Sequence, residues 1–308
     1  MAIATSPMIR AVNTELAPAL HCSLFQTHRK VFTVVALSML ALTGSGLVSS
    51  PIEMPIPAGL AILVLGVPHG AFDVAIWNSR NGDRSAHGLS GMLVKYVALA
   101  GGFFCLWLIA PEVALPIFIA MSIYHFSSDW DHDLDGIPRL IVAGAMISAP
   151  AALHRAEVIE IFSWLSPTET ANAVALAMAT AALPLLQASL VVMVLTAARR
   201  PWAAAELAAV LALAWLTPPL MFFLVYFCGL HAVRHMIETH RLLGAPAGYT
   251  FACAAFPYAP LAIAGTVGGA LTFSTLPPGP ALVGAIFMAL GALTVPHIIV
   301  VDWYGSTD

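Results

Sequence analysis

The chain has 308 residues, of which 60% are hydrophobic and only 9% are charged, and its mean hydropathy is +0.89. Soluble domains carry about 25% charged residues, so this composition indicates an integral membrane protein. The formal net charge of -4 is small, and no run of Lys or Arg forms the basic patch that nucleic-acid binding requires. We therefore expect no nucleic-acid partner.

Apolar stretches close to the roughly 20 residues needed to cross a bilayer recur along the chain. They predict an all-α, polytopic transmembrane helix bundle with about ten spans, or eight to nine if neighbouring stretches share one span. Residues 1–30 are expected to form a mobile N-terminal tail, and residues 31–308 a single transmembrane catalytic domain. The expected spans cover residues 31–49, 56–76, 93–110, 112–128, 137–153, 173–197, 201–216, 218–237, 255–274 and 280–302.

The distribution of basic residues predicts the orientation of the spans. When the N-terminus is placed in the cytoplasm, all of the 12 Lys and Arg residues except Arg155 fall on or near the cytoplasmic side. Cytoplasmic loops of membrane proteins carry this excess of positive charge. We therefore expect an even number of spans with both termini in the cytoplasm, and a multi-pass protein of the cell inner membrane.

Four short histidine motifs interrupt the apolar sequence. They are GVPHGAFD around His69, YHFSSD around His125, HAVRH at His231 and His235, and PHIIVVD around His297. In the expected topology they lie on the second, fourth, eighth and tenth spans, which all run in the same direction. Each histidine is then roughly 20–25 Å from the outer boundary of a hydrocarbon core about 30 Å thick. The five imidazoles are therefore expected to meet at one depth.

Acidic residues accompany three of these motifs. Asp73 and Asp129 each follow the histidine of their motif by four residues, and Asp302 follows its histidine by five. Residues four apart share a helix face, and a metal-bound imidazole usually donates its other N–H to a carboxylate or carbonyl. The three aspartates are thus candidates to orient the histidines. Each could serve its own helix or a neighbouring one, and the spacing leaves these pairings open.

A lone polar residue in a span often does no more than join two helices by a hydrogen bond. Five histidines at matched depth favour a shared polar site instead, because burying ionisable groups in a membrane costs on the order of 2.5–3.5 kcal/mol each. Imidazoles without a cysteine ligand suit iron, zinc, copper or nickel, and disfavour calcium and magnesium. Outside the motifs we expect His28 to be solvated. Within HAVRH we expect Arg234 to point away from the two histidines, toward the inner interface or an acidic partner.

The motifs, in this order and on alternating spans, resemble those of the Brp/Blh family of membrane-embedded β-carotene 15,15'-dioxygenases. The resemblance covers residues from about 55 to the C-terminus. It implies an all-helical membrane enzyme that uses non-haem ferrous iron, Fe(2+), and O2 to cleave the central double bond of β-carotene into two molecules of all-trans-retinal. It also implies that His69, His125, His231 and His235 are the catalytic iron ligands, with His297 either a fifth ligand or a residue behind them.

The same resemblance implies a slot for a long polyene beside the metal. Partners would be β-carotene or a related carotenoid, O2, membrane lipid and a retinal-accepting protein. Ser127 departs from the family pattern, in which glycine is often found, and this puts the role of Asp129 in doubt. Aromatic residues near the motifs that could line the slot are Phe72, Tyr124, Phe126, Phe223, Tyr226 and Phe227.

Two other classes of protein fit a histidine cluster in a membrane. A zinc-dependent intramembrane hydrolase of the ceramidase-like kind would hold zinc with histidines and activate water. A metal or proton transporter would use the histidines as a relay, and would require a polar path to both membrane faces. Zinc in the purified protein would favour the first, and polar residues in the outer halves of the spans would favour the second.

Overall fold

The structure is a computed structural model that describes residues 7–47, 50–80, 86–243, 259–270 and 275–305. All regular elements within these ranges are helical, which confirms the all-α prediction. In chain order they are α1 (Pro7–Gly44), η1 (Pro51–Glu53), α2 (Pro55–Ala61), η2 (Ile62–Gly66), η3 (Val67–Phe72), α3 (Asp73–Arg80), α4 (Ala86–Ile109), α5 (Pro111–Ser127), η4 (Ser128–Trp130), α6 (Ile137–Ser148), α7 (Pro150–Leu153), α8 (Arg155–Ser163), α9 (Thr168–Ala197), α10 (Pro201–Leu216), α11 (Pro219–Tyr226), η5 (Phe227–His231), α12 (Ala232–Leu243), α14 (Ala259–Ala270) and α15 (Pro278–Gly305).

Proline residues mark where many of these helices begin. Pro111 begins α5, Pro201 begins α10, Pro219 begins α11 and Pro278 begins α15. Proline is favoured at the first helical position because its missing N–H would have no intrahelical partner there and its φ is already helical. These prolines therefore divide a continuously apolar sequence into separate helices.

Five described helical segments are long and apolar enough to cross a membrane: Pro55–Ser79, Gly88–Ile109, Thr168–Ala197, Pro219–Leu243 and Pro278–Asp302. A sixth results if the pair Ile137–Leu153 and Arg155–Ser163, bent by 103°, counts as one broken span. These segments coincide with six of the ten expected spans. The structure thus supports a helical membrane protein, and the count of ten stays a prediction.

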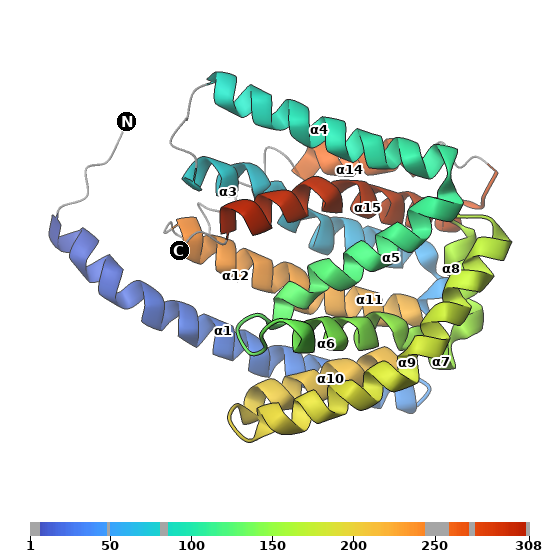
Figure 1. The fold of residues 1–308 in the computed structure, drawn as a ribbon, viewed down its shortest axis with the longest axis horizontal. Coiled ribbons are helices and arrows are strands. Elements are labelled where there is room, and N and C mark those ends of the chain that lie inside the picture. Colours follow the sequence, from blue (N-terminus) through green and yellow to red (C-terminus); the bar gives the residue numbers. More distant parts are fainter. Residues whose placement is uncertain (1–6, 48–49, 81–85, 244–258, 271–274, 306–308) are drawn as a thin grey trace.

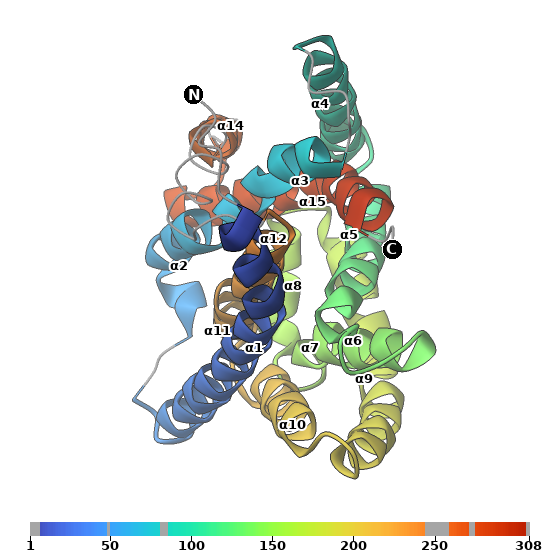
Figure 2. The same ribbon diagram turned by 90° about the vertical axis from the view of Figure 1, so that its left-hand side faces the viewer.

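The motif-bearing helices lie at the centre of the molecule. Helix α15 packs against α2, α3, α4, α5 and α14, and α12 packs against α3 and η3. Figure 1 shows α4 and α14 above this group, and α1, α6, α9 and α10 below it. In the turned view of Figure 2, α4 and α14 stand apart from each other on the side of α15 that faces away from α10.

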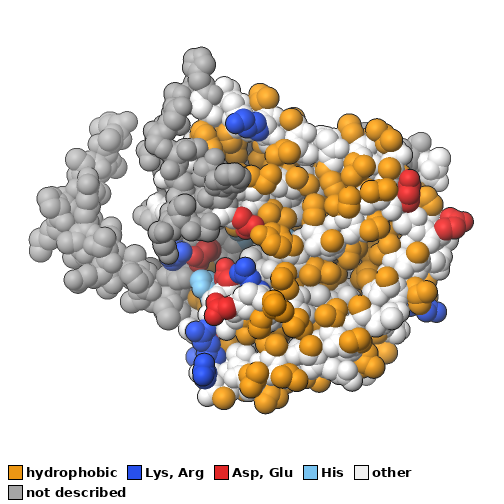
Figure 3. Space-filling model, viewed as in Figure 1, with side chains coloured by type: hydrophobic (Ala, Val, Ile, Leu, Met, Phe, Trp, Pro, Cys, Tyr) orange, Lys and Arg blue, Asp and Glu red, His pale blue; other side chains and the backbone are white. Residues whose placement is uncertain are grey.

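The surface of the molecule is largely apolar. Figure 3 shows hydrophobic side chains across the whole middle of one face, with charged side chains toward the left and right ends of the view. Large side chains such as Val94, Ile109, Val194 and Leu195 are 64–82% exposed. A water-soluble monomer rarely exposes such a continuous apolar surface, so this belt fits the hydrocarbon of a bilayer.

Helix α1 enters the region expected to be a tail. It begins at Pro7 and continues as one helix to Gly44, so most of residues 1–30 are helical rather than irregular. Helix α1 also packs against α10 and α12. The mobility of residues 1–30 stays a prediction.

Candidate metal centre

The structure brings the five motif histidines together. His69 lies on η3, His125 near the end of α5, His231 at the end of η5, His235 on α12 and His297 on α15. Neighbouring ring centroids are 4.7–5.5 Å apart. Segments far apart in the sequence thus supply one compact cluster of imidazoles.

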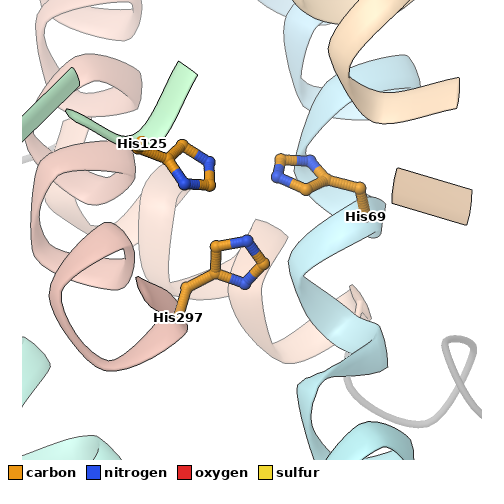
Figure 4. A group of neighbouring side chains, drawn as sticks. All are labelled: His69, His125 and His297. Atoms are coloured by element: carbon orange, nitrogen blue, oxygen red, sulfur yellow. The ribbon is translucent and has the colours of Figure 1, made fainter. Parts of the chain in front are cut away.

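Three of these imidazoles converge on one point. Figure 4 shows the rings of His69, His125 and His297 directed toward one another from three separate segments. Their ligand nitrogens all lie within 4.8 Å of one another. Nε2 of His125 is also 3.0 Å from Nε2 of His231. This arrangement provides several nitrogen lone pairs around a single small volume.

The cluster is buried, and two of its nitrogens have no partner among the described residues. His69, His125, His231 and His297 are at most 9% exposed, and His235 is half-buried. Nε2 of His235 and Nε2 of His297 are buried without a hydrogen bond within the described ranges. A buried polar atom left unpaired costs about 1–3 kcal/mol, which metal coordination would offset. The donor set therefore fits a metal ion that prefers imidazole nitrogen.

Two aspartates orient histidines of other helices rather than their own. Asp73 Oδ1 lies 2.7 Å from Nδ1 of His297, and Asp129 Oδ1 lies 3.0 Å from Nδ1 of His231. A carboxylate at Nδ1 fixes the proton there and leaves Nε2 free to bind a metal. The spacing left the aspartate–histidine pairs open, and the structure shows two of them. Asp73 contacts His297 and Asp129 contacts His231, each on another helix.

The cross-bundle pairing follows from local backbone geometry. His69 is in the 3₁₀ helix η3, which ends just before Asp73, and Asp129 is in the 3₁₀ helix η4 just after His125. A 3₁₀ helix has three residues per turn, so a residue four positions on no longer lies on the same face. His69 instead directs Nδ1 to the carbonyl oxygen of Gly66.

Asp302 takes a different position from the other two aspartates. Its side chain is exposed, and its Oδ2 accepts a hydrogen bond from the Tyr124 hydroxyl at 2.6 Å. Tyr124 is itself 50% exposed. The structure therefore places Asp302 at the surface with a tyrosine partner.

Each of the two buried aspartates also accepts a tyrosine hydroxyl. Tyr96 donates to Oδ2 of Asp73 at 2.8 Å, and Tyr226 donates to Oδ2 of Asp129. Both carboxylates are thus held between a tyrosine and a histidine. Sequence reasoning missed Tyr96, because α4 approaches Asp73 only through tertiary packing.

A buried ion-pair network lies behind Asp129. Arg234 is 5% exposed, forms an ion pair with Glu206 and donates to the backbone carbonyl of Asp129 at 2.6 Å. Arg29 shares Glu206 at 3.0 Å and also pairs with Asp133. The sequence predicted that Arg234 points either to the inner interface or to an acidic partner, and the structure shows the second. The partner itself, Glu206, is fully buried on α10 and was not identified from the sequence.

His28 is not solvated as expected. It is half-buried, and its Nε2 lies 2.8 Å from the carbonyl oxygen of Gly229. The expectation was wrong because α1 continues as a helix and packs against the HAVRH region instead of leaving the bundle.

An apolar cavity of about 480 Å³ reaches the cluster. His69, His125 and His297 form part of its wall. Of the six aromatic residues expected to line a substrate slot, the structure places Phe126, Phe223 and Phe227 in the wall. Phe72 packs in a separate apolar cluster, and the positions of Tyr124 and Tyr226 are given above. The volume falls within the roughly 300–1,000 Å³ typical of small-molecule sites.

Glycine permits a close approach beside the cluster. A Cβ at Gly66 would overlap the ring of Phe227, which contacts the imidazole of His69 edge-on at 5.2 Å between centroids. Gly66 is the last residue of the π-helical turn η2, and Phe227 is the first residue of the π-helical turn η5. Such turns occur frequently at functional sites because they re-aim side chains locally.

Buried imidazoles braced by carboxylates, inside a helical bundle with membrane-spanning segments, define a membrane protein with a histidine-type candidate metal centre. The chain belongs to the β-carotene 15,15'-dioxygenase family, whose sequence model matches residues 60–305 and so includes all five motif histidines. This confirms the resemblance seen in the motifs.

Two named relatives support the family assignment. The β-carotene 15,15'-dioxygenase of the uncultured marine bacterium 66A03 is 28% identical over 276 residues, which covers 79% of this chain and 92% of the relative. A protein of Halobacterium salinarum named "Probable beta-carotene 15,15'-dioxygenase Blh" is 29% identical, with 87% of this chain and 90% of the relative covered. No solved structure matches the chain.

Proposed function

We propose that this protein is a non-haem iron dioxygenase that cleaves the central 15,15' double bond of β-carotene with O2, giving two molecules of all-trans-retinal. Family membership supports the substrate and the reaction class. The observation that carries the proposal is the apolar cavity whose wall includes His69, His125 and His297. A hydrocarbon substrate could rest there directly beside the proposed metal.

The residues that would hold the iron are His69, His125, His231 and His235. His297 is either a fifth ligand or a residue behind the ligands, and its Nε2, which has no hydrogen-bond partner among the described residues, favours the first role. Imidazole alone does not separate iron from zinc. A reaction with O2 does, because zinc has no redox chemistry. Iron bound there would supply the binding and electron transfer that O2 chemistry requires.

The protein's own side chains would keep the ligands in place. Asp73 and Asp129 hold Nδ1–H of His297 and His231, so that each presents Nε2 to the centre of the cluster. Tyr96 and Tyr226 fix the two carboxylates in turn. Preorganised ligands avoid a reorganisation cost when metal and substrate bind.

The cavity would position the polyene and exclude water. The phenyl rings of Phe126, Phe223 and Phe227 line the cavity together with three of the histidines. Aromatic and aliphatic walls offer no hydrogen bonds to water, and they bury an apolar ligand favourably. These side chains would hold one chosen C=C bond beside the cluster.

We also propose how the whole chain crosses the membrane. It has ten spans with both termini in the cytoplasm, in the cell inner membrane, and residues 31–308 form one catalytic domain. The placement of all Lys and Arg residues except Arg155 on or near one side of the expected spans supports it. Membrane lipid would surround the apolar belt, and a retinal-accepting protein would take up the product.

The two alternative classes are not favoured. A ceramidase-like zinc hydrolase would cleave an amide or ester without O2, and a transporter would need a polar path on both sides of the cluster. Neither agrees with the family to which the chain belongs. The largely apolar cavity wall also argues against the polar path that a transporter would need.

Expression in cells that accumulate β-carotene tests the proposal. Cells that produce this protein are expected to bleach and to contain all-trans-retinal, and the variant His231→Ala is expected to do neither. Persistent colour at good expression, or retinal formation by the alanine variant, would contradict the proposal. Metal analysis of the purified protein then distinguishes iron from zinc.

A further inference from the structure

One face each of α4 and α14 borders the cavity that reaches the histidines. The α4 face includes Tyr96, Ala100 and Gly101, and the α14 face includes Gly265 and Gly269. Both helices pack against α15, which forms the floor between them. Figure 2 shows α4 and α14 standing apart on this side of α15.

The borders of this cavity reach the outer surface of the molecule. Val97 on α4 is 67% exposed and lines the cavity. Gly101 on α4 and Gly265 on α14 are also exposed, and a Cβ built on either would meet no described atom within 4 Å. The cavity therefore reaches the surface of the described structure at this edge, where the exposed residues are apolar and suit the hydrocarbon of a bilayer.

The hydroxyl groups in the wall do not make the opening polar. Ser122 donates to the carbonyl of Phe118 at 2.8 Å, Thr266 to the carbonyl of Ala262 at 2.8 Å, and Thr294 to the carbonyl of its own helix at 2.7 Å. Each of these three hydroxyls is thus satisfied by its own helix backbone, and the Tyr96 hydroxyl in the wall is satisfied by Asp73. An apolar guest would lose no hydrogen bond in passing these residues.

The length of the cavity suits part of an extended chain. Its lining on α15 runs from Ala285 to His297, which is roughly 18 Å at 1.5 Å per residue. The unpartnered, buried Nε2 of His297 lies at one end. A polyene almost as long as the roughly 30 Å hydrocarbon core would place about half its length along this stretch.

We propose that a linear polyene hydrocarbon dissolved in the bilayer reaches the histidines sideways, between α4 and α14, with Gly101 and Gly265 keeping the opening wide enough. The inference rests on the proposed function and adds the route to the same site. It assigns the two glycines a role in substrate access rather than in helix packing.

The chain offers matched controls for both glycines. Gly102 and Gly268 are exposed on the same helices, and neither lines the cavity. Within the described ranges, a Cβ on either meets nothing within 4 Å. Leucine at any of these positions improves helix propensity, so no variant is expected to unfold the helix. Only Gly101→Leu and Gly265→Leu would put a branched side chain into the opening.

The test measures β-carotene binding and turnover separately. Full-length wild-type protein and the four leucine variants are reconstituted in lipid nanodiscs that contain β-carotene, without O2, and bound carotenoid per protein is determined by absorbance. O2 is then admitted and retinal is quantified. We expect Gly101→Leu and Gly265→Leu to lose at least about 10-fold in both, and Gly102→Leu and Gly268→Leu to stay within about 2-fold of wild type.

The outcomes separate this route from the proposed reaction. If wild type produces retinal and all four variants bind and react as it does, the route is overturned and the reaction stands. If the opening variants lose binding but wild type forms no retinal, the route stands and the reaction fails. Equal losses in the control variants, or a wild-type protein that retains no β-carotene, also overturn the route.

Discussion

Replacing Asp129 by asparagine is expected to lower the metal affinity of the histidine cluster by roughly 10- to 100-fold. The two carboxylate oxygens lie 3.0 and 3.2 Å from Nδ1 of His231, and Tyr226 donates to Oδ2. Asparagine keeps the shape and one acceptor oxygen. It loses the negative charge that favours the Nδ1–H tautomer, and its NH2 group would face a hydroxyl that already donates.

The expected loss corresponds to about 1.4–2.8 kcal/mol of binding free energy, at about 1.4 kcal/mol for each factor of ten. Anaerobic titration of the purified protein with ferrous iron, in competition with a chelator of known affinity, measures it directly. Asp135→Asn is the matched control, because Asp135 is exposed a few residues further along the chain. Its iron affinity is expected to equal that of wild type.

Iron binding by Asp129→Asn within about twofold of wild type would refute the reasoning, since second-layer partners of a ligating imidazole usually matter more than that. An equal loss in Asp135→Asn would refute it as well, because the effect would then come from general charge rather than from the hydrogen bond to His231.

Asp73→Asn is expected to lower iron affinity by roughly 10-fold in the same titration, and unchanged affinity would argue against its role at the second braced imidazole. Glu206→Gln removes the carboxylate that two buried arginines share. We expect it to lower the free energy of unfolding, measured by denaturation in detergent micelles, by roughly 3–5 kcal/mol. The control Glu169→Gln, at an exposed position, is expected to lower it by less than about 1 kcal/mol, and equal effects of the two variants would contradict the reasoning. Gly66→Ala is expected to destabilise by about 1–3 kcal/mol because its Cβ would overlap a phenylalanine ring of η5, whereas Gly91→Ala, with open space at its Cβ, should be neutral or slightly stabilising. Equal melting temperatures for the two alanine variants would refute the overlap.

The sequence was sufficient to predict the helical membrane fold and the histidines that form the cluster. Composition and the length of the apolar stretches predicted a helical membrane protein, because a bilayer requires long apolar helices. The matched depth of His69, His125, His231 and His297 in those stretches predicted that they would meet. The arithmetic works because helices that cross the same slab in the same direction have equal rise per residue.

The residues that hold the histidines in place were harder to predict from the sequence. The spacing left open which histidine each aspartate contacts, because same-face spacing applies only while the chain stays α-helical. The 3₁₀ turns at η3 and η4 rotate Asp73 and Asp129 away from the histidines of their own motifs. Glu206 gave no signal, since a lone acid in an apolar helix matches no motif. Tyr96 is 23 residues from Asp73, and only the packing of neighbouring helices brings the two side chains to 2.8 Å.

The sequence by itself determined that this chain is a helical membrane protein with a shared histidine site, and its motifs identified the family. Both conclusions depend on composition and on spacing along single helices. The tertiary structure decided which carboxylate braces which imidazole, which aromatic residues reach the cavity, and where that cavity opens. Those features depend on how separate helices pack and rotate against one another, and a pattern along one helix carries no information about the face that its neighbour presents.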